Sequence, residues 1–131
     1  MSLPTRLPIY RNLVVVHYHL RPGGVRRIIE LALPHIAQAS PTPLGAIVLA
    51  TGEKPESDWR EIVTRSLPGM PVHFFCEPAF RYLSEQRSSP EVVRGKVRSA
   101  LEKLARTFSP TETLFWAQNL ALARNLILSD E

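Results

Sequence analysis

The fold of this chain is decided by residues 12–31, which read NLVVVHYHLRPGGVRRIIEL. Residues 13–16 form a short, continuous run of mostly β-branched side chains, which is typical of a strand buried on both faces of a parallel sheet. Residues 21–24 break this pattern with a proline and two glycines, and from Val25 onward apolar residues recur at helical spacing. The stretch therefore predicts a strand, a glycine turn and a helix in direct succession.

The rest of the chain repeats this alternation. Further strands are predicted, each from an apolar run of strand length, at residues 44–50, 72–76 and 113–117. Further helices are predicted at residues 59–67, 89–108 and 120–128, and a short helix or turn-rich connection at residues 79–87. Alternating strands and helices predict an α/β, Rossmann-like fold, with a parallel sheet and helices on both faces. Residues 1–11 are an irregular lead-in, and residues 12–131 are expected to form a single domain.

Four residues carry more specific expectations. Pro34 lies inside the first helical pattern and removes a backbone hydrogen bond, so it is expected to kink or end that helix within a turn. Ile62 is expected on the apolar side of the second helix. Ser89 is expected to cap the third, because a serine followed by proline is typical of a helix start. Cys76, the only cysteine, is interpreted as a buried strand residue rather than a reactive thiol.

Composition limits the class of protein. The 131 residues are 44% hydrophobic and 21% charged, which predicts one soluble globular domain. No apolar run approaches the ~20 residues of a spanning helix, and no signal-peptide core is present, so we expect a cytoplasmic protein. A single cysteine excludes an intramolecular disulfide and fits a reducing compartment. The net charge of +4 favours anionic partners such as nucleotides, phosphosugars, nucleic acid or acidic membranes.

The helix predicted at residues 89–108 has a basic outer face. Its cations are Arg94, Lys96, Arg98 and Lys103. The simplest interpretation is a solvated surface, with peripheral membrane contact as an open alternative. No aromatic residues are interleaved with these cations, so we expect no nucleic-acid partner.

The glycine turn is the first candidate for ligand binding. Ligands of parallel α/β sheets bind beyond the carboxyl ends of the strands, and the unpaired amides of a helix N-terminus attract anions. Gly23 and Gly24 would let a phosphate approach that backbone closely. Arg26 and Arg27 lie in the first helical turn, where the helix dipole disfavours cations, and this local conflict favours a ligand. The alternative is a tight turn with solvated arginines. The glycine patterns of dinucleotide-binding proteins and of P-loops are incomplete, so ATP hydrolysis is not expected.

Polar residues at two strand ends form a second group of candidates. His17 and His19 alternate, so in an extended segment both side chains point the same way and suit a hydroxyl-rich ligand or a metal. No third metal ligand is visible, so we expect no metal. Gln118 and Asn119 follow the fourth strand at the same edge, where amides can pair with hydroxyl groups. Asn119 would alternatively cap the last helix. Arg124, farther along that helix, would face the same crevice or solvent.

Residues 17–31 and 116–125 together resemble two segments of the retaining glycosyltransferases of family 4, which have the GT-B fold. Members of this family open with a strand, a Gly-Gly-Val loop and a helix. In the second segment a histidine often precedes the asparagine, where this chain has Gln118. The resemblance implies that the donor diphosphate is approached by Gly23, Gly24 and Arg21. It also implies that the acceptor is contacted by His17, His19, Gln118, Asn119 and Arg124.

The resemblance covers the first half of a two-domain architecture. It implies transfer of a sugar from a nucleotide-diphosphate sugar to a carbohydrate or lipid-linked acceptor, with retention and without a cofactor. The C-terminal GT-B domain that holds the nucleotide sugar is absent from this sequence, so we expect that domain of the same protein as a partner and no transfer by this chain alone. The alternative is a non-enzymatic α/β binding or partner-interaction domain.

Overall fold

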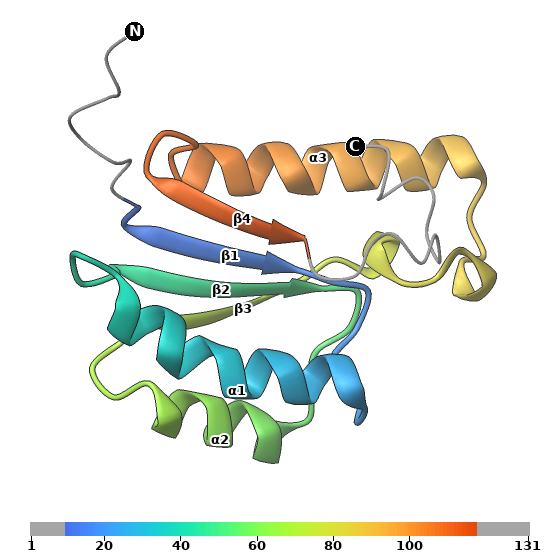
Figure 1. The fold of residues 1–131 in the computed structure, drawn as a ribbon. Helices are drawn as coiled ribbons and strands as arrows, with labels where there is room; N and C mark the ends of the chain where they lie inside the picture. The colour runs from blue at the N-terminus through green and yellow to red at the C-terminus, as the bar shows by residue number, and fades with distance from the viewer. Residues whose placement is uncertain (1–9, 118–131) are drawn as a thin grey trace, which may run out of the picture.

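The computed structural model describes residues 10–117 of the chain (Figure 1). Its four strands are β1 (Asn12–Val16), β2 (Ala46–Thr51), β3 (Val72–Cys76) and β4 (Thr113–Ala117). Its helices are α1 (Gly24–Ala39), α2 (Ser57–Ser66) and α3 (Pro90–Thr107). Between β3 and α3 lie two 3₁₀ turns, Pro78–Phe80 and Leu83–Glu85. Strands and helices therefore alternate along the chain as the sequence predicts.

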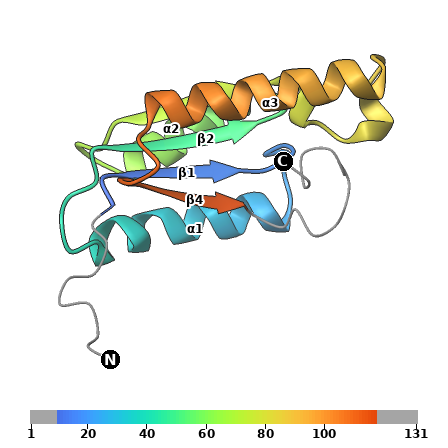
Figure 2. The same ribbon diagram turned by 90° about the horizontal axis from the view of Figure 1, so that it is seen from above.

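The strands form one parallel sheet in the order β3-β2-β1-β4. The arrows labelled in Figure 2 all point to the same end of the molecule, so the carboxyl ends of the strands share one edge. Figure 1 shows α1 and α2 on one face of the sheet and α3 on the other. The α/β, Rossmann-like fold with helices on both faces is thus confirmed.

Two apolar cores lie on the two faces of the sheet. Leu13 and Val15 of β1 pack in the core under α1 and α2, whereas Val14 and Val16 pack in the core under α3. All four side chains are at most 5% exposed. Because successive side chains of a strand point to opposite faces, a strand covered on both sides must be apolar at every position. This explains the continuous run at residues 13–16.

The start of α3 follows the pattern expected from its sequence. The hydroxyl of Ser89 accepts a hydrogen bond of 3.4 Å from the Val92 amide, and Pro90 occupies the first helical position. Val93, Val97 and Leu104 are then buried along one side of the helix. The cap and the apolar stripe therefore agree on where α3 begins and which side it buries.

Helix α1 continues past Pro34 and ends at Ala39, because Leu33 is fully buried and Ile36 packs against the same core, so tertiary packing outweighs the local cost of the proline. Two expectations about the burial of side chains were wrong. Ile62 is 51% exposed, because Trp59 and Val63 take the buried side of α2. Cys76 is exposed, because β3 is the last strand of the sheet and has a neighbour on one side only among the described residues.

The helix expected at residues 120–128 lies outside the described residues. Among residues 10–117, no helix combines the length and apolar character needed to cross a bilayer. The first described strand begins at Asn12, and residues 1–9 of the expected lead-in lie outside the described residues.

Candidate functional site

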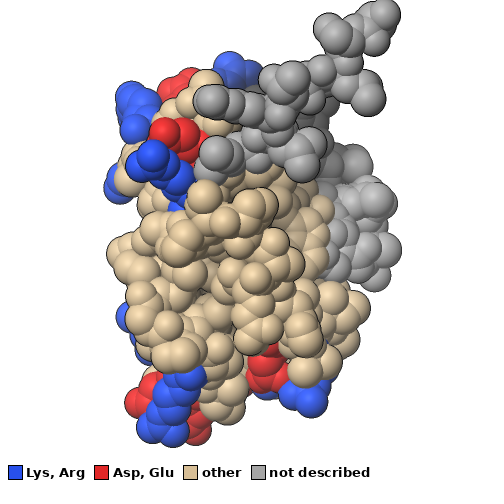
Figure 3. Space-filling model, turned by 60° about the vertical axis from the view of Figure 1, so that its left-hand side comes forward, with Lys and Arg blue, Asp and Glu red and all other residues tan. Residues whose placement is uncertain are grey.

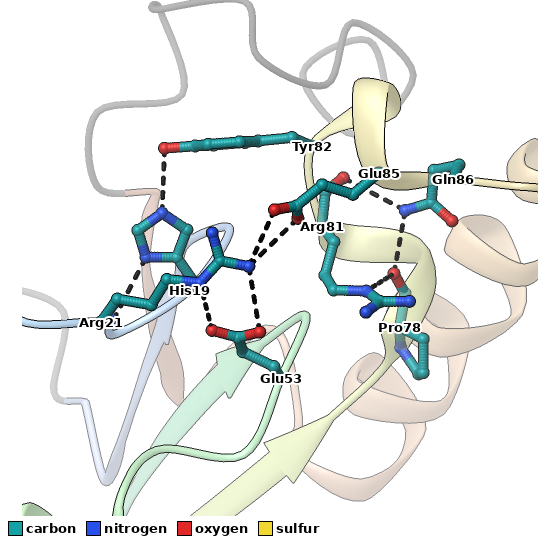
Figure 4. A network of polar contacts seen from close by, with 8 residues as sticks. All are labelled: His19, Arg21, Glu53, Pro78, Arg81, Tyr82, Glu85 and Gln86. Carbon is teal, nitrogen blue, oxygen red and sulfur yellow. Dashed lines mark hydrogen bonds and ion pairs between the residues drawn. The ribbon is translucent and has the colours of Figure 1, made fainter.

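Polar side chains from three loops meet at the carboxyl edge of the sheet (Figure 4). The loop after β1 contributes His19 and Arg21, the loop after β2 contributes Glu53, and the connection after β3 contributes Tyr82 and Glu85. We call these five residues the carboxyl-edge cluster. Loops at this edge are adjacent because parallel strands all end there, which is why ligand sites of α/β sheets form at it.

Arg21 lies between two carboxylates. Its Nε donates to Glu53 Oε1 at 2.5 Å and its Nη2 donates to Glu53 Oε2 at 3.1 Å. The same Nη2 also donates to Glu85, at 2.9 and 3.2 Å. The hydrogen bonds from Arg21 hold the pKa of Glu53 below its usual value, and the two carboxylates raise the pKa of Arg21. Arg21 is therefore held by two protein carboxylates, and its hydrogen bonds to Glu53 favour the ionised form of that carboxyl group.

His19 connects Arg21 to Tyr82. Its Nδ1 accepts a hydrogen bond of 3.2 Å from the Arg21 amide, and its Nε2 lies 2.9 Å from the Tyr82 hydroxyl. Burial, and next the charge of Arg21, lower the pKa of His19, so the neutral ring is favoured. Because Nδ1 accepts from an amide, the proton of the neutral ring resides on Nε2 and is donated to Tyr82.

His17 lies behind this layer rather than in it. It is only 3% exposed, and its ring centroid lies 4.9 Å from that of Tyr18 and 5.9 Å from that of His19. The Tyr82 ring packs edge-on against both Tyr18 and His19. The expected proximity of the two histidines is present, but only His19 reaches the polar side of the cluster.

At Gly52, in the loop after β2, the backbone lies directly against the backbones of the loop after β1 and the connection after β3. Its amide donates to the Tyr18 carbonyl at 2.7 Å. A Cβ at this position would stand 2.5 Å from the Arg81 amide nitrogen and 2.7 Å from the Tyr18 oxygen, too close for real contacts. Only glycine fits where the loops after β1, β2 and β3 pass this close to one another.

The glycine turn predicted to approach a diphosphate lies beside the cluster and is open. Gly23 has φ 158°, a conformation that favours glycine, and both glycines are exposed. A Cβ on Gly24 would meet nothing within 4 Å. No side chain among the described residues caps α1, so its first amides face this open space.

The two arginines of the first α1 turn are engaged by protein groups. The Arg26 guanidinium lies 5.7 Å from the Trp59 ring centroid, and Arg27 forms an ion pair with Glu30. Glu30 also accepts a hydrogen bond of 3.1 Å from the Trp59 indole. The Arg27–Glu30 pair lies within α1 and explains Arg27 without a ligand. Arg26 is only partly satisfied, because its Nη1 is buried without a hydrogen-bond partner among the described residues and lies 3.9 Å from Glu56.

A polar hollow of about 440 Å³ adjoins the cluster. Its lining includes Arg81, Glu85, Gln86, Arg87 and Lys96. The Gln86 amide shapes its wall by donating to the Pro78 carbonyl at 2.9 Å and to the Arg81 carbonyl at 3.2 Å. Because Glu85 belongs both to this hollow and to the Arg21 clamp, the two regions form one continuous polar surface.

The opposite edge of the sheet has a different character. The view in Figure 3, turned toward the amino ends of the strands, shows a broad centre without charged side chains. A mainly apolar hollow of about 250 Å³ lies there, between Tyr10, Ile36, Leu44 and Leu114. This edge therefore offers a mainly apolar hollow, in contrast to the charged cluster at the carboxyl edge.

The structure brings part of the predicted site together. His19, Arg21, Gly23 and Gly24 are neighbours at the carboxyl edge. Three predicted acceptor residues, Gln118, Asn119 and Arg124, lie outside the described residues. Strand β4 ends at Ala117 in register with Val16, at the same edge.

Sequence reasoning missed Glu53, Tyr82 and Glu85. Glu53 follows β2 by two residues, so the rule that ligands bind beyond strand ends would have found it. Tyr82 and Glu85 lie in a connection without periodicity, where no local signal marked them.

Within residues 10–117, no group of three or more His, Cys, Asp or Glu side chains is placed to hold a metal ion. Comparisons of the chain with protein-family models, with curated proteins and with solved structures found no match.

Proposed function

We propose that this chain is the acceptor-side domain of a GT-B-type transferase, which works in the cytoplasm and moves a sugar from a nucleotide-diphosphate donor to an acceptor hydroxyl with retention. The observation that carries the proposal is the carboxyl-edge cluster. Its polar side chains come from three loops and meet at the carboxyl edge of the sheet, beside an exposed glycine turn. The resemblance of residues 17–31 to the opening segment of family 4 supports the same assignment. Transfer requires the C-terminal domain of such an enzyme in addition to this chain.

The chemistry of the cluster suits a hydroxyl-rich acceptor. The carboxylate oxygens of Glu53 and Glu85 accept hydrogen bonds, and carbohydrate hydroxyl groups donate them. Arg21 holds both carboxylates in place and so limits their motion when an acceptor binds. In this proposal Glu53 and Glu85 orient the acceptor, and Arg21 positions them.

The glycine turn suits the donor diphosphate. Amides at the start of α1 face open space, and neither Gly23 nor Gly24 carries a side chain that would obstruct a phosphate. Backbone N–H groups aimed at a departing diphosphate stabilise the charge that develops on it during transfer. Arg21 would contribute to the same charge only by leaving Glu53 and Glu85.

The test is a titration of the ¹⁵N-labelled chain with UDP-glucose and GDP-mannose, and separately with methyl glycosides of glucose, galactose and mannose. We expect the nucleotide sugars to shift the amide signals of Gly23 and Gly24, and an accepted glycoside to shift those of Glu53 and Glu85. Millimolar concentrations are appropriate, because one domain supplies only part of each binding site.

Two glycine variants make this test specific. Gly24→Ala adds a Cβ where nothing lies within 4 Å, so it leaves the fold intact but obstructs the approach of a phosphate. Gly95→Ala, on the exposed side of α3, is the matched control because its Cβ is equally free of contacts. Equal nucleotide-sugar affinity in Gly24→Ala and the control would refute the diphosphate site. Absence of any response at the carboxyl edge would favour the non-enzymatic alternative.

A further inference from the structure

Strand β3 has a free edge in the described part of the chain. On the side of β2, the Pro71 carbonyl accepts a hydrogen bond of 2.9 Å and the Glu77 amide donates one of 2.9 Å. In a parallel strand, alternate residues direct their N–H and C=O groups to the same side. Val72, Phe74 and Cys76 therefore direct theirs away from β2, and among residues 10–117 these groups have no backbone partner.

A hollow lies on each side of this edge. The hollow on the α2 side measures about 510 Å³ and includes Phe74, and the hollow on the α3 side measures about 530 Å³ and includes Phe75. In each, a cation lies over the aromatic ring: Arg60 is 5.9 Å from the Phe74 centroid, and Lys103 is 5.9 Å from the Phe75 centroid. In the hollow on the α3 side, Gly95 and Ser99 of α3 contribute only small side chains to the lining. We call these two spaces the edge hollows.

The edge hollows are positively charged. Their cations are Arg60, Arg65, Lys96 and Lys103, and their carboxylates are Glu61 and Glu77, which leaves a net charge of +2. Both carboxylates are already engaged, since Glu61 lies 3.8 Å from Arg65 and Glu77 accepts from the Ala79 amide at 3.0 Å. Neither Lys96 nor Lys103 has an ion pair with another described residue. Charge complementarity therefore favours an acidic occupant.

We propose that the free edge of β3 binds an extended acidic segment of a partner protein, which adds to the sheet as a further strand. Its backbone pairs with Val72, Phe74 and Cys76, and its alternating side chains enter the two edge hollows. Acidic side chains there meet Lys96 and Lys103 on one face and Arg60 on the other. This interaction goes beyond sugar transfer and does not depend on it.

The same observations select a peptide over other occupants. A second copy of this chain would bring the same basic hollows and a net charge of +4 against them, which opposes edge-to-edge pairing. A nucleic acid supplies negative charge but has no alternating N–H and C=O groups to pair with a strand. Only an acidic peptide satisfies both the charge and the backbone of the edge.

The probe is an acetylated and amidated eight-residue peptide in which pairs of glutamates alternate with pairs of valines, so that both faces of the added strand carry glutamate. We expect it to shift the amide signals of β3 and to slow hydrogen exchange at Val72, Phe74 and Cys76. A peptide of the same sequence with a methyl group on every peptide nitrogen keeps its charges but cannot pair, so it should bind about tenfold more weakly or worse. A lysine–valine peptide should not bind. Equal binding of the methylated peptide would overturn strand addition.

Variants of the chain locate the site. Lys96→Glu combined with Lys103→Glu should weaken the glutamate peptide by about tenfold or more. Arg106→Glu, on the same helix outside the hollows, should leave its affinity unchanged. The thiol of Cys76 provides an independent signal, because a bound peptide should protect it from a thiol reagent. The proposal is overturned if both charge variants weaken binding equally or if the thiol reacts as fast with peptide as without it.

Two competing occupants are tested in parallel. Single-stranded oligouridine that displaces the peptide and binds more tightly would assign the hollows to nucleic acid. Self-association of the chain that slows hydrogen exchange at Val72 and Phe74 would assign the edge to a second copy. Either result would overturn the proposed peptide site.

Discussion

The Nε2 atom of His19 lies 2.9 Å from the hydroxyl of Tyr82, although 63 positions separate the two residues. The contact joins the loop after β1 to the connection after β3 across the end of β2. It forms one side of the carboxyl-edge cluster, and the Arg21 clamp forms the other. Protonation of the His19 ring therefore affects contacts that hold the loop after β1 and the connection after β3 together.

We predict that His19 titrates below its ordinary pKa and that this makes the chain less stable in mild acid. The pKa in the folded state is lowered from 6.5, so the unfolded chain binds the proton more tightly. The contribution of the neutral His19 ring to the free energy of unfolding is complete above pH 6.5, and it is lost as the pH falls through the lowered pKa of the folded chain. Proton NMR of the ring should give the pKa directly, and urea unfolding should show the loss of stability. His19→Gln should remove that part of the pH dependence, and a His19 pKa at or above 6.5 would contradict the prediction.

Replacing Arg21 should destabilise the chain through its two carboxylates. Arg21→Gln leaves Glu53 and Glu85 close together without the cation that bonds both, so we expect a loss of up to about 1 kcal/mol of unfolding free energy at neutral pH. The folded pKa of Glu53 is lowered, so its contribution is present above pH 4.5 and fades below it. Urea unfolding of the variant and the wild type should converge in strong acid.

The matched control for Arg21 is Arg11→Gln. Arg11 lies 3.8 Å from Glu112, and both side chains are largely exposed, so this change should have no measurable effect on stability. Equal effects of the two substitutions would show that the Arg21 clamp is no stronger than a surface ion pair.

Gly52→Ala should be strongly destabilising, whereas Gly95→Ala should be stabilising. The new Cβ at position 52 would collide with the backbones of Arg81 and Tyr18, and overpacking of this kind costs about 1–3 kcal/mol or more. At position 95, inside an exposed part of α3, alanine is the better helix former by about 0.5–1 kcal/mol. Thermal unfolding of the two variants should therefore shift in opposite directions, and shifts of the same sign would refute the packing at Gly52.

The Cys76 thiol should react with iodoacetamide in the native chain, but slowly at neutral pH. It is exposed, so no unfolding is needed for reaction. Partial desolvation of the sulfur by neighbouring groups, and next the charge of Glu77, raise the pKa of the Cys76 thiol from its ordinary value, so the reactive thiolate is scarce at neutral pH. The rate should rise about tenfold per pH unit through pH 9. In urea the thiol loses its folded surroundings, so the reaction rate should level off at a lower pH than in the native chain. A native chain that resists labelling would show that the Cys76 thiol is buried, contrary to this prediction.

Sequence patterns predicted the elements because the forces that form them are local or periodic. The apolar run at residues 13–16 and the Ser89 cap are local signals that can be recognised without knowledge of the rest of the fold. The bounds of the strands and of α3 were therefore predictable to within about two residues. The burial of Ile62 was mispredicted because it depends on which side of α2 packs against the sheet. Cys76 was mispredicted because the position of β3 at the edge depends on strand order, which no local pattern records.

The site was only partly predictable for the same reason. His19, Arg21 and the glycine turn lie in one segment with a readable pattern. Their partners Glu53, Tyr82 and Glu85 come from two other loops, and only the three-dimensional order of the strands brings them together. The family resemblance assigned Arg21 to the donor diphosphate, whereas in the structure its guanidinium is held by the carboxylates of Glu53 and Glu85.

Strand β1 lies between β2 and β4 in the sheet, and these two neighbours are synthesised at very different times. Residues of β2 follow it closely, but Asn12 pairs with Thr113, which is 101 positions later. During synthesis on the ribosome, the backbone edge of β1 that pairs with β4 stays unpaired until nearly the whole described chain has been translated. The nascent chain thus carries an unfinished sheet for most of its synthesis, which makes this fold dependent on protection from aggregation at that stage.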